Sequence, residues 1–353
     1  MRKVSLLVAA ALLAACTASD TPGEALPATS DPTLDLSERL DALARQSCPE
    51  GISYVRAEAI NISAEPVSLG DAPDVAEALN GVTFAGGWHL QSENPKFGGL
   101  SGMDVLPSGG LLTVSDQGAF VWIGLENGAP DGIGGLADMR GADGAVFSDK
   151  RNGDAEGLAV DAGRAIVSFE RNHRALVYDL EACGSSARGA VLASIPRRIA
   201  DAGPRLEDNG GLEGLAISSD QLIGTIEAEK SGTVSLIRID ASAPDLIGTL
   251  EAPDGLAPTG LDTLDDAVFA VFRDYAPGVG NTIEVRRYTD AQTNGETLLR
   301  LARPLAVDNF EAVAVREWSD GRTRLYLLSD DNFSERQRTL LFAFDINNSA
   351  PTD

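Results

Sequence analysis

One local pattern returns five times along the chain, about every 50 residues, and such a repeat restricts the fold more than any other feature. Each copy opens with a small or acidic residue, then Gly or Ala and an apolar stretch. The openings are GGLSGM (98–103), DAEGLA (154–159), GLEGLA (211–216), PTGLD (258–262) and NFEAVA (309–314). A tight turn and a second apolar run follow each opening. The second runs, each ending in an acidic residue, are LLTVSD (111–116), AIVSFE (165–170), LIGTIE (222–227), VFAVFRD (268–274) and LYLLSD (325–330).

Three or four short antiparallel strands per repeat are typical of the blade of a β-propeller. A β-sandwich also has many short strands, but it gives no reason for one motif to return five times. We therefore predict an all-β fold, a single β-propeller of five or six blades with three to four antiparallel strands each, over residues 51–347. Strand 82–89 should pair with LLFAFDI (340–346) in a closing blade, which removes exposed sheet edges. Residues 51–63 leave room for a sixth blade.

The repeat also predicts where polar side chains gather. In an antiparallel hairpin, the start of the first strand and the end of the second lie at the same rim. The residues at the first strand's start are Ser101, Glu156, Glu213, Thr259 and Glu311. The residues at the second strand's end are Asp116, Glu170, Glu227, Glu229, Asp274, Asp330 and Asp331. We expect both sets at one mouth of the central channel.

Carboxylates crowded at a channel mouth repel one another, so some must bind protons or a cation. Oxygen ligands favour a hard ion, Ca²⁺ first and Mg²⁺ second. The candidate metal ligands are Glu156, Glu170, Glu213, Glu227, Glu311 and Asp330. Basic neighbours that suit a phosphate or carboxylate ligand are Arg171, His173, Lys230 and Arg273. Alternatively, the glutamates only accept hydrogen bonds from backbone amides of neighbouring blades and hold the propeller together.

The first three openings and the closing segment, NFEAVAV…LYLLSDDNF…QRTLLFAFD, resemble the phytase-like family, also labelled esterase-like activity of phytase. The resemblance covers about residues 82–347 and is most specific over 308–344. It implies a β-propeller and the hydrolysis of phosphate esters or other esters. Two positions depart from the pattern: the fourth opening has Thr259 in place of a carboxylate, and the fifth has Ala312 where Gly is usual.

Two functions are consistent with these residues. In the first, a rim-bound Ca²⁺ holds an ester, one of Glu156, Glu213 and Glu311 activates water, and Arg or Lys stabilises the developing charge. In the second, the propeller is not catalytic and its rim binds an envelope protein or a glycan. The fold alone does not separate them, because propellers serve both purposes.

Other chemistries have weaker support in the sequence. Gly99-Leu-Ser-Gly-Met103 resembles a nucleophile elbow but lacks the second Gly, and it precedes no helix. Only His89 and His173 could serve a serine nucleophile as a base, and two histidines without a paired Cys motif make a zinc site weak. Phosphate-binding GxxxxGK[ST] and dinucleotide-binding GxGxxG motifs are absent.

The N-terminal segment predicts export. Residues 1–15 have two basic residues and a short apolar run, as in a signal peptide, and Leu13-Ala14-Ala15-Cys16 resembles the lipobox in which Cys is lipidated. Residues 16–50 are expected to form a flexible tether with a short helix at 34–46. Thr17, rather than Asp, favours anchoring in the outer membrane, at the periplasmic face of the envelope.

Charge and the remaining cysteines limit the partners. A formal charge of −25 repels nucleic acid and anionic lipid headgroups. We therefore expect a small anionic ester as ligand, no nucleic acid, membrane contact through the lipid alone, and a monomer. In an oxidising compartment, Cys48 and Cys183 are expected to form a disulfide.

Overall fold

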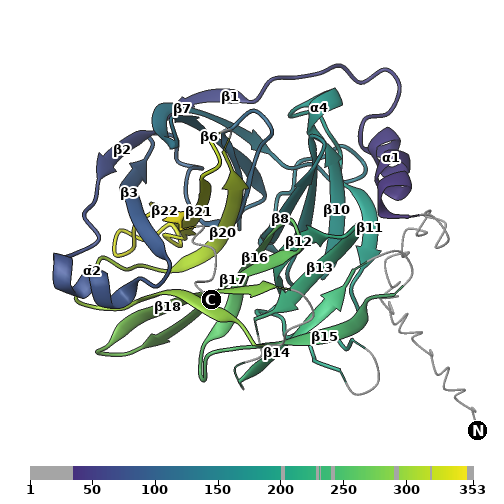
Figure 1. The fold of residues 1–353 in the computed structure, drawn as a ribbon. Coiled ribbons are helices and arrows are strands. Elements are labelled where there is room, and N and C mark those ends of the chain that lie inside the picture. The colour runs from purple at the N-terminus through teal and green to yellow at the C-terminus, as the bar shows by residue number, and fades with distance from the viewer. Residues whose placement is uncertain are drawn as a thin grey trace, which may run out of the picture.

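The computed structural model describes residues 35–199, 203–227, 230, 232–239, 243–289, 294–318 and 320–347. Five antiparallel sheets stand around a common axis as the blades of a propeller, which confirms the predicted fold class (Figure 1). Blade 1 contains β4 (Leu100–Val105), β5 (Leu111–Ser115), β6 (Ala119–Glu126) and β7 (Ala129–Asp138). Blade 2 contains β8 (Ala155–Asp161), β9 (Arg164–Phe169), β10 (Arg174–Asp179) and β11 (Ala190–Ser194).

The next two blades follow the same order from the axis outward. Blade 3 contains β12 (Leu212–Ser218), β13 (Gln221–Ile226), β14 (Thr233–Arg238) and β15 (Asp245–Glu251). Blade 4 contains β16 (Ala257–Leu264), β17 (Ala267–Ala276), β18 (Gly280–Thr289) and β19 (Glu296–Leu301). The five innermost strands, β4, β8, β12, β16 and that of blade 5, pack side by side in a closed ring.

Blade 5 joins the two ends of the chain. It begins at the axis with β20 (Phe310–Glu317), β21 (Thr323–Ser329) and β22 (Leu340–Ile346), and continues with β3 (Val82–Gln91) from the N-terminal part. Leu340 pairs with His89 and Ile346 with Val82, as the sequence predicted. Because β20 also packs against β4 of blade 1, this blade closes the ring.

The predicted room for a sixth blade is filled differently. Within residues 51–66, β1 (Glu58–Asn61) pairs with β7, and β2 (Ser63–Pro66) pairs with β3. Each therefore extends an existing blade by one outer strand, and the propeller has five blades. The two short strands β1 and β2 could not form a blade of their own, because a blade needs three or four strands.

The core lies between the blades and not within them. Blades 2 and 3 bury a common cluster that includes Ile166 and Leu215, and blades 4 and 5 bury another that includes Val271 and Phe342. The strands are nearly continuous apolar runs because both faces of each sheet are covered by a neighbouring blade.

In the part of the chain that the structure describes, four helices lie outside the blades: α1 (Leu36–Ser47), α2 (Ala72–Ala78), α3 (Lys150–Gly153) and α4 (Leu180–Cys183). Asp35 caps α1 by accepting a hydrogen bond from the Glu38 amide at 2.8 Å. The buried Leu40 and Leu43 pack α1 against β10 and β11, so the folded part begins well before residue 51. No helix in the described ranges is long and apolar enough to span a bilayer.

A disulfide joins Cys48, at the end of α1, to Cys183 at the end of α4, with the Cα atoms 5.6 Å apart. The bond ties the N-terminal helix to blade 2 across 135 positions of sequence. Residues 36–48 are thus part of the domain, where the sequence predicted a tether.

Each innermost strand has the same irregularity near its start. The register with the second strand slips at Ser101, at Glu156 and Gly157, at Glu213, at Thr259 and at Glu311. A β-bulge of this kind leaves a residue unpaired and turns its side chain away from the regular alternation. The five predicted rim residues are therefore the bulged residues of their strands.

The Gly after a bulged residue allows neighbouring blades to approach closely. A Cβ added to Gly102 would lie 2.3 Å from the carbonyl oxygen of Glu156, and one added to Gly260 would lie 2.4 Å from that of Glu311. The glycine of the repeat is therefore explained by contact between adjacent innermost strands.

Candidate metal centre at the channel mouth

The structure brings acidic side chains from four of the five blades, all but blade 4, to one end of the ring. We call this set the channel mouth, and its members are Asp116, Asp154, Glu156, Glu170, Glu213, Glu227, Glu311 and Asp330. Except for Asp154, which precedes β8, they come from the bulge of an innermost strand or from the end of a second strand, the two places that the repeat predicted.

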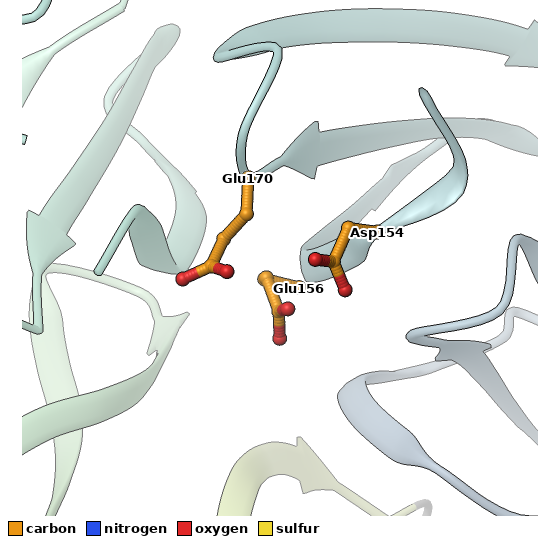
Figure 2. A group of neighbouring side chains, drawn as sticks. All are labelled: Asp154, Glu156 and Glu170. Carbon is orange, nitrogen blue, oxygen red and sulfur yellow. The ribbon is translucent and has the colours of Figure 1, made fainter. Parts of the chain in front are cut away.

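Two overlapping groups of three carboxylates have the spacing of a metal site. In the group of Asp154, Glu156 and Glu170, one oxygen from each residue lies within 4.8 Å of the others. Figure 2 shows these three carboxylates turned toward a common space. Glu170, Glu213 and Glu227 form a second group with the same limit. Glu170 belongs to both, so five carboxylates from blades 2 and 3 surround one region.

The glutamates at the bulges accept no hydrogen bond from a backbone amide of a neighbouring blade among the described residues. Glu213 accepts a hydrogen bond at 3.2 Å from the Gly211 amide of its own blade, and Glu311 accepts one at 2.8 Å from Nδ2 of Asn309. No described residue donates a hydrogen bond to the Glu156 carboxylate. Some of the mouth glutamates do make contacts across blades: Glu170, at the end of β9, accepts a hydrogen bond from the Gly211 amide at 3.1 Å, and Glu311 lies 3.2 Å from Arg273 of blade 4.

Two aspartates further along the innermost strands have the structural role instead. Asp104 of β4 accepts a hydrogen bond at 2.6 Å from the Val160 amide of β8. Asp262 of β16 does the same with the Val315 amide of β20, also at 2.6 Å. Different positions of the innermost strand thus have different roles. These aspartates join neighbouring blades, and the glutamates at the bulges face the channel.

The mouth disfavours negative charge, as the pKa values of its carboxyl groups indicate. Burial, and then the charges of Glu213 and Glu170, raise the pKa of Glu156 well above its usual value. Burial, and then Glu227 and Glu170, do the same to the pKa of Glu213. Burial and the neighbouring Asp154 raise the pKa of Glu170 to about 7. The ionised cluster is therefore unfavourable unless a cation or protons neutralise it.

The two mouth carboxyl groups of blade 5, Glu311 and Asp330, also have raised pKa values. Burial raises the pKa of Glu311, against the opposing effect of the Arg273 guanidinium. Burial and then Glu311 raise the pKa of Asp330 well above its usual value. Asp330 is nevertheless outside both groups of three, and its carboxylate accepts a hydrogen bond at 2.6 Å from the Asn332 amide. The structure places it at the mouth but does not bring it into the closest clusters.

The basic residues predicted to bind an anion are mostly engaged by carboxylates. Arg273 lies 3.3 Å from Glu227 and 3.2 Å from Glu311, so it bridges blades 3 and 5. Arg171 forms an ion pair with the buried Asp154. Lys230 is exposed and lies 3.6 Å from Asp274, away from the clusters. His173 is buried, and burial lowers the pKa of its ring.

Two residues that the structure places at or beside the mouth, Asp154 and Lys150, were not predicted there from the sequence. Asp154 is the first residue of DAEGLA, two positions before Glu156, and only the structure shows that it shares a site with Glu170. Lys150, on α3, reaches Asp116 at 2.6 Å and Asp154 at 3.5 Å. The sequence offers little indication of Asp154 and Lys150, because both lie in or next to α3, in an insertion between blades that the repeat does not predict. Glu229 lies outside the described residues.

The donor set fits a hard divalent cation. Every candidate ligand is a carboxylate oxygen, and the Oδ1 atoms of Asp116 and Asp154 are buried without a hydrogen-bond partner among the described residues. A serine nucleophile has no such support. The Ser101 hydroxyl is buried without a hydrogen-bond partner, so neither histidine is bonded to it.

Comparisons with solved structures find only distant similarities. An aldose sugar dehydrogenase of Streptomyces coelicolor, in its PQQ-bound form, is 13% identical with a TM-score of 0.44, over 76% of this chain and 99% of that one. The glutaminyl cyclase of Myxococcus xanthus is 12% identical with a TM-score of 0.41, over 83% and 97%. Mala s 1, the major allergen of Malassezia sympodialis, is 16% identical with a TM-score of 0.38, over 93% and 99%.

Comparison with curated proteins finds no significant match. The family comparison is specific: residues 95–333 match the phytase-like family, described as esterase-like activity of phytase. The match covers strands β4 to β19 of blades 1 to 4 and strands β20 and β21 of blade 5, with every residue of the channel mouth. The chain therefore belongs to the phytase-like family.

Proposed function

We propose that this protein hydrolyses phosphate esters or related anionic esters at the channel mouth, with a bound divalent cation, Ca²⁺ before Mg²⁺. The supporting observation is the pair of overlapping carboxylate groups that share Glu170. The family description, which names an esterase-like activity, agrees with this chemistry. Asp154, Glu170, Glu213 and Glu227 would hold the cation, with the Glu156 carboxylate beside them.

When bound, the cation would polarise the ester and make a bound water more acidic. The chain's own residues supply the proton transfers. Glu156 is our first candidate to take a proton from water, because its carboxylate accepts no hydrogen bond from described residues and lies beside the proposed cation ligands. Glu213 and Glu311 remain the other candidates. Arg273 and Lys150 place positive charge beside these carboxylates, where it can stabilise charge on the ester.

A panel of phosphate monoesters, phytate and carboxylic esters tests the proposal. The purified protein should hydrolyse at least one phosphate ester with Ca²⁺ present, and an excess of EDTA should abolish the reaction until Ca²⁺ is restored. Rates that survive complete chelation would contradict the mechanism. No hydrolysis across the panel, with tight binding to an envelope protein or glycan, would favour the non-catalytic alternative.

We also propose that the protein acts outside the cytoplasm, anchored by lipid on Cys16 in the outer membrane. The support is the lipobox-like LAAC sequence and the presence of a disulfide between the other two cysteines. The variant Cys16→Ser should move the protein from the membrane fraction to the soluble fraction. Mass spectrometry of the N-terminal peptide should find acyl groups only on the wild type; unchanged partitioning of the variant would refute the anchor.

A further inference from the structure

A second polar cavity lies beside the channel mouth, between blades 4 and 5. It is a groove of about 1120 Å³, bounded by the β17–β18 hairpin, residues 303–309 and residues 334–338. Four arginines line it: Arg273, Arg303, Arg336 and Arg338. We call it the arginine groove. Its size is that of a site for a small molecule.

The charge of this groove is opposite to that of the protein. The chain has only 28 basic residues against 53 acidic ones, yet Asp308 is the only acidic residue among the described residues that line the groove. Asp308 lies 3.3 Å from Arg338 and neutralises it. Arg303 and Arg336 are exposed, and neither has an ion-pair partner among the described residues. Two guanidinium groups therefore remain available to an anion.

The groove continues into the channel mouth through two residues. Arg273 lines the groove and also pairs with Glu227 and Glu311. Asn309, which is buried, lines the groove and donates its side-chain amide to Glu311. A ligand in the groove would thus lie next to the proposed catalytic carboxylates.

The remaining walls offer groups that suit a sugar. Asn281, Ser334 and Gln337 present neutral polar side chains that can hydrogen-bond to hydroxyl groups. Tyr275 lines the same groove with 61% of its surface exposed, and its ring can pack on the apolar face of a sugar. Guanidinium groups bind phosphate and carboxylate through paired hydrogen bonds.

We propose that the arginine groove binds a polyhydroxylated ligand with two or more anionic groups, such as a sugar bisphosphate. Arg303 and Arg336 hold one anionic group, and another lies against Arg273 at the border of the groove with the channel mouth. The proposal depends on the proposed hydrolase function only where it takes the groove ligand to be the substrate of that reaction. Binding to the groove itself needs no cation at the mouth.

Calorimetric titration of the purified protein in EDTA tests the groove apart from hydrolysis. Fructose 1,6-bisphosphate should bind, fructose should not, and inorganic phosphate should bind at least tenfold more weakly than the bisphosphate. The double variant Arg303→Gln/Arg336→Gln should weaken bisphosphate binding at least tenfold and leave the melting temperature unchanged. The double variant Arg45→Gln/Arg56→Gln removes the same charge from exposed positions outside the groove and should bind like the wild type.

Three results would overturn the proposal. The first is a wild type that does not bind the bisphosphate, and the second is equal weakening by the two double variants, which would indicate a nonspecific charge effect. The third is phosphate binding as tight as that of the bisphosphate, which would indicate an anion site without a sugar site. If the bisphosphate binds in EDTA as predicted but no ester is hydrolysed with Ca²⁺, the ligand proposed for the arginine groove is supported and the hydrolase proposal fails.

Discussion

Without Ca²⁺, the folded protein is expected to lose stability as the pH rises from about 4.5 to 7. The folded state raises the pKa of Glu170 from 4.5 to about 7, so between these values it binds more protons than the unfolded chain does. The stability is therefore full below pH 4.5 and falls as the pH passes through the folded pKa. With allowance for solvent screening at the mouth, this group alone accounts for on the order of 2 kcal/mol of unfolding free energy.

Added Ca²⁺ should reverse this loss, because a bound cation neutralises the same carboxylates. At a hundredfold excess over the dissociation constant, binding to the folded state alone stabilises it by about 2.7 kcal/mol. The melting temperature should then rise by several degrees at pH 8 and by much less at pH 5, where protons compete for the ligands. Scanning calorimetry at both values, with Ca²⁺ and then EDTA, measures the effect.

Variants distinguish a metal ligand from a structural residue. Glu213→Gln keeps the size of the side chain and removes its charge, so it should blunt the Ca²⁺ response and raise the stability of the metal-free protein at pH 8. Glu65→Gln, at an exposed position of β2, is the matched control and should change neither. If Glu213→Gln instead lowers the stability equally with and without Ca²⁺, the glutamates serve only the fold.

Replacing Glu156 by Gln should lower the Ca²⁺-dependent hydrolysis by a factor of about 100 or more. An amide cannot accept the proton of the attacking water, and general base catalysis contributes about 10²–10⁴-fold. The loss should fall on kcat more than on KM, since the amide still occupies the same space beside the ester. Steady-state kinetics on the best substrate of the panel gives both constants.

The stability of Glu156→Gln makes the kinetic result interpretable. Because the Glu156 carboxylate holds no hydrogen bond from the described part of the chain, its replacement should leave the metal-free protein at least as stable as the wild type. Asp104→Asn provides the contrast: it weakens a buried bond to the Val160 amide and should lower stability without entering the chemistry. Near-normal kcat in Glu156→Gln would exclude Glu156 as the base and direct attention to Glu213 and Glu311.

The sequence predicts the propeller because each blade repeats the same short motif, tight turn and second apolar run. The strand pairing of the closing blade, 82–89 with 340–346, followed from the need to cover sheet edges and is confirmed. The extra strand of blade 1 could not be predicted, because β1 is only four residues long and pairs with a strand about 70 residues away. Residues 51–63 therefore looked like the start of another blade.

The candidate site was predictable only where it repeats. Glu156, Glu213 and Glu311 occupy the same place in successive repeats, so one hairpin geometry placed all three. Asp154 and Lys150 depend on the particular insertion before β8, and the arginine groove joins two loops with no common pattern. The ion pairs of Arg171 and Arg273 likewise depend on side-chain contacts between elements that sequence spacing does not relate.

The closing blade can form only after the whole domain has been synthesised, because it combines strands from both ends of the chain. Strand β3 emerges early but finds its partner only when β22, some 250 residues later, is complete. Until then, blades 1 and 5 each expose a face that the finished ring covers, so the chain cannot reach its stable state while it is still being made. Pairing of the last strand therefore completes the coverage of both neighbouring strand edges in blade 5. Conversely, loss of the final strand β22 would leave β3 and β21 as open edges and favour aggregation.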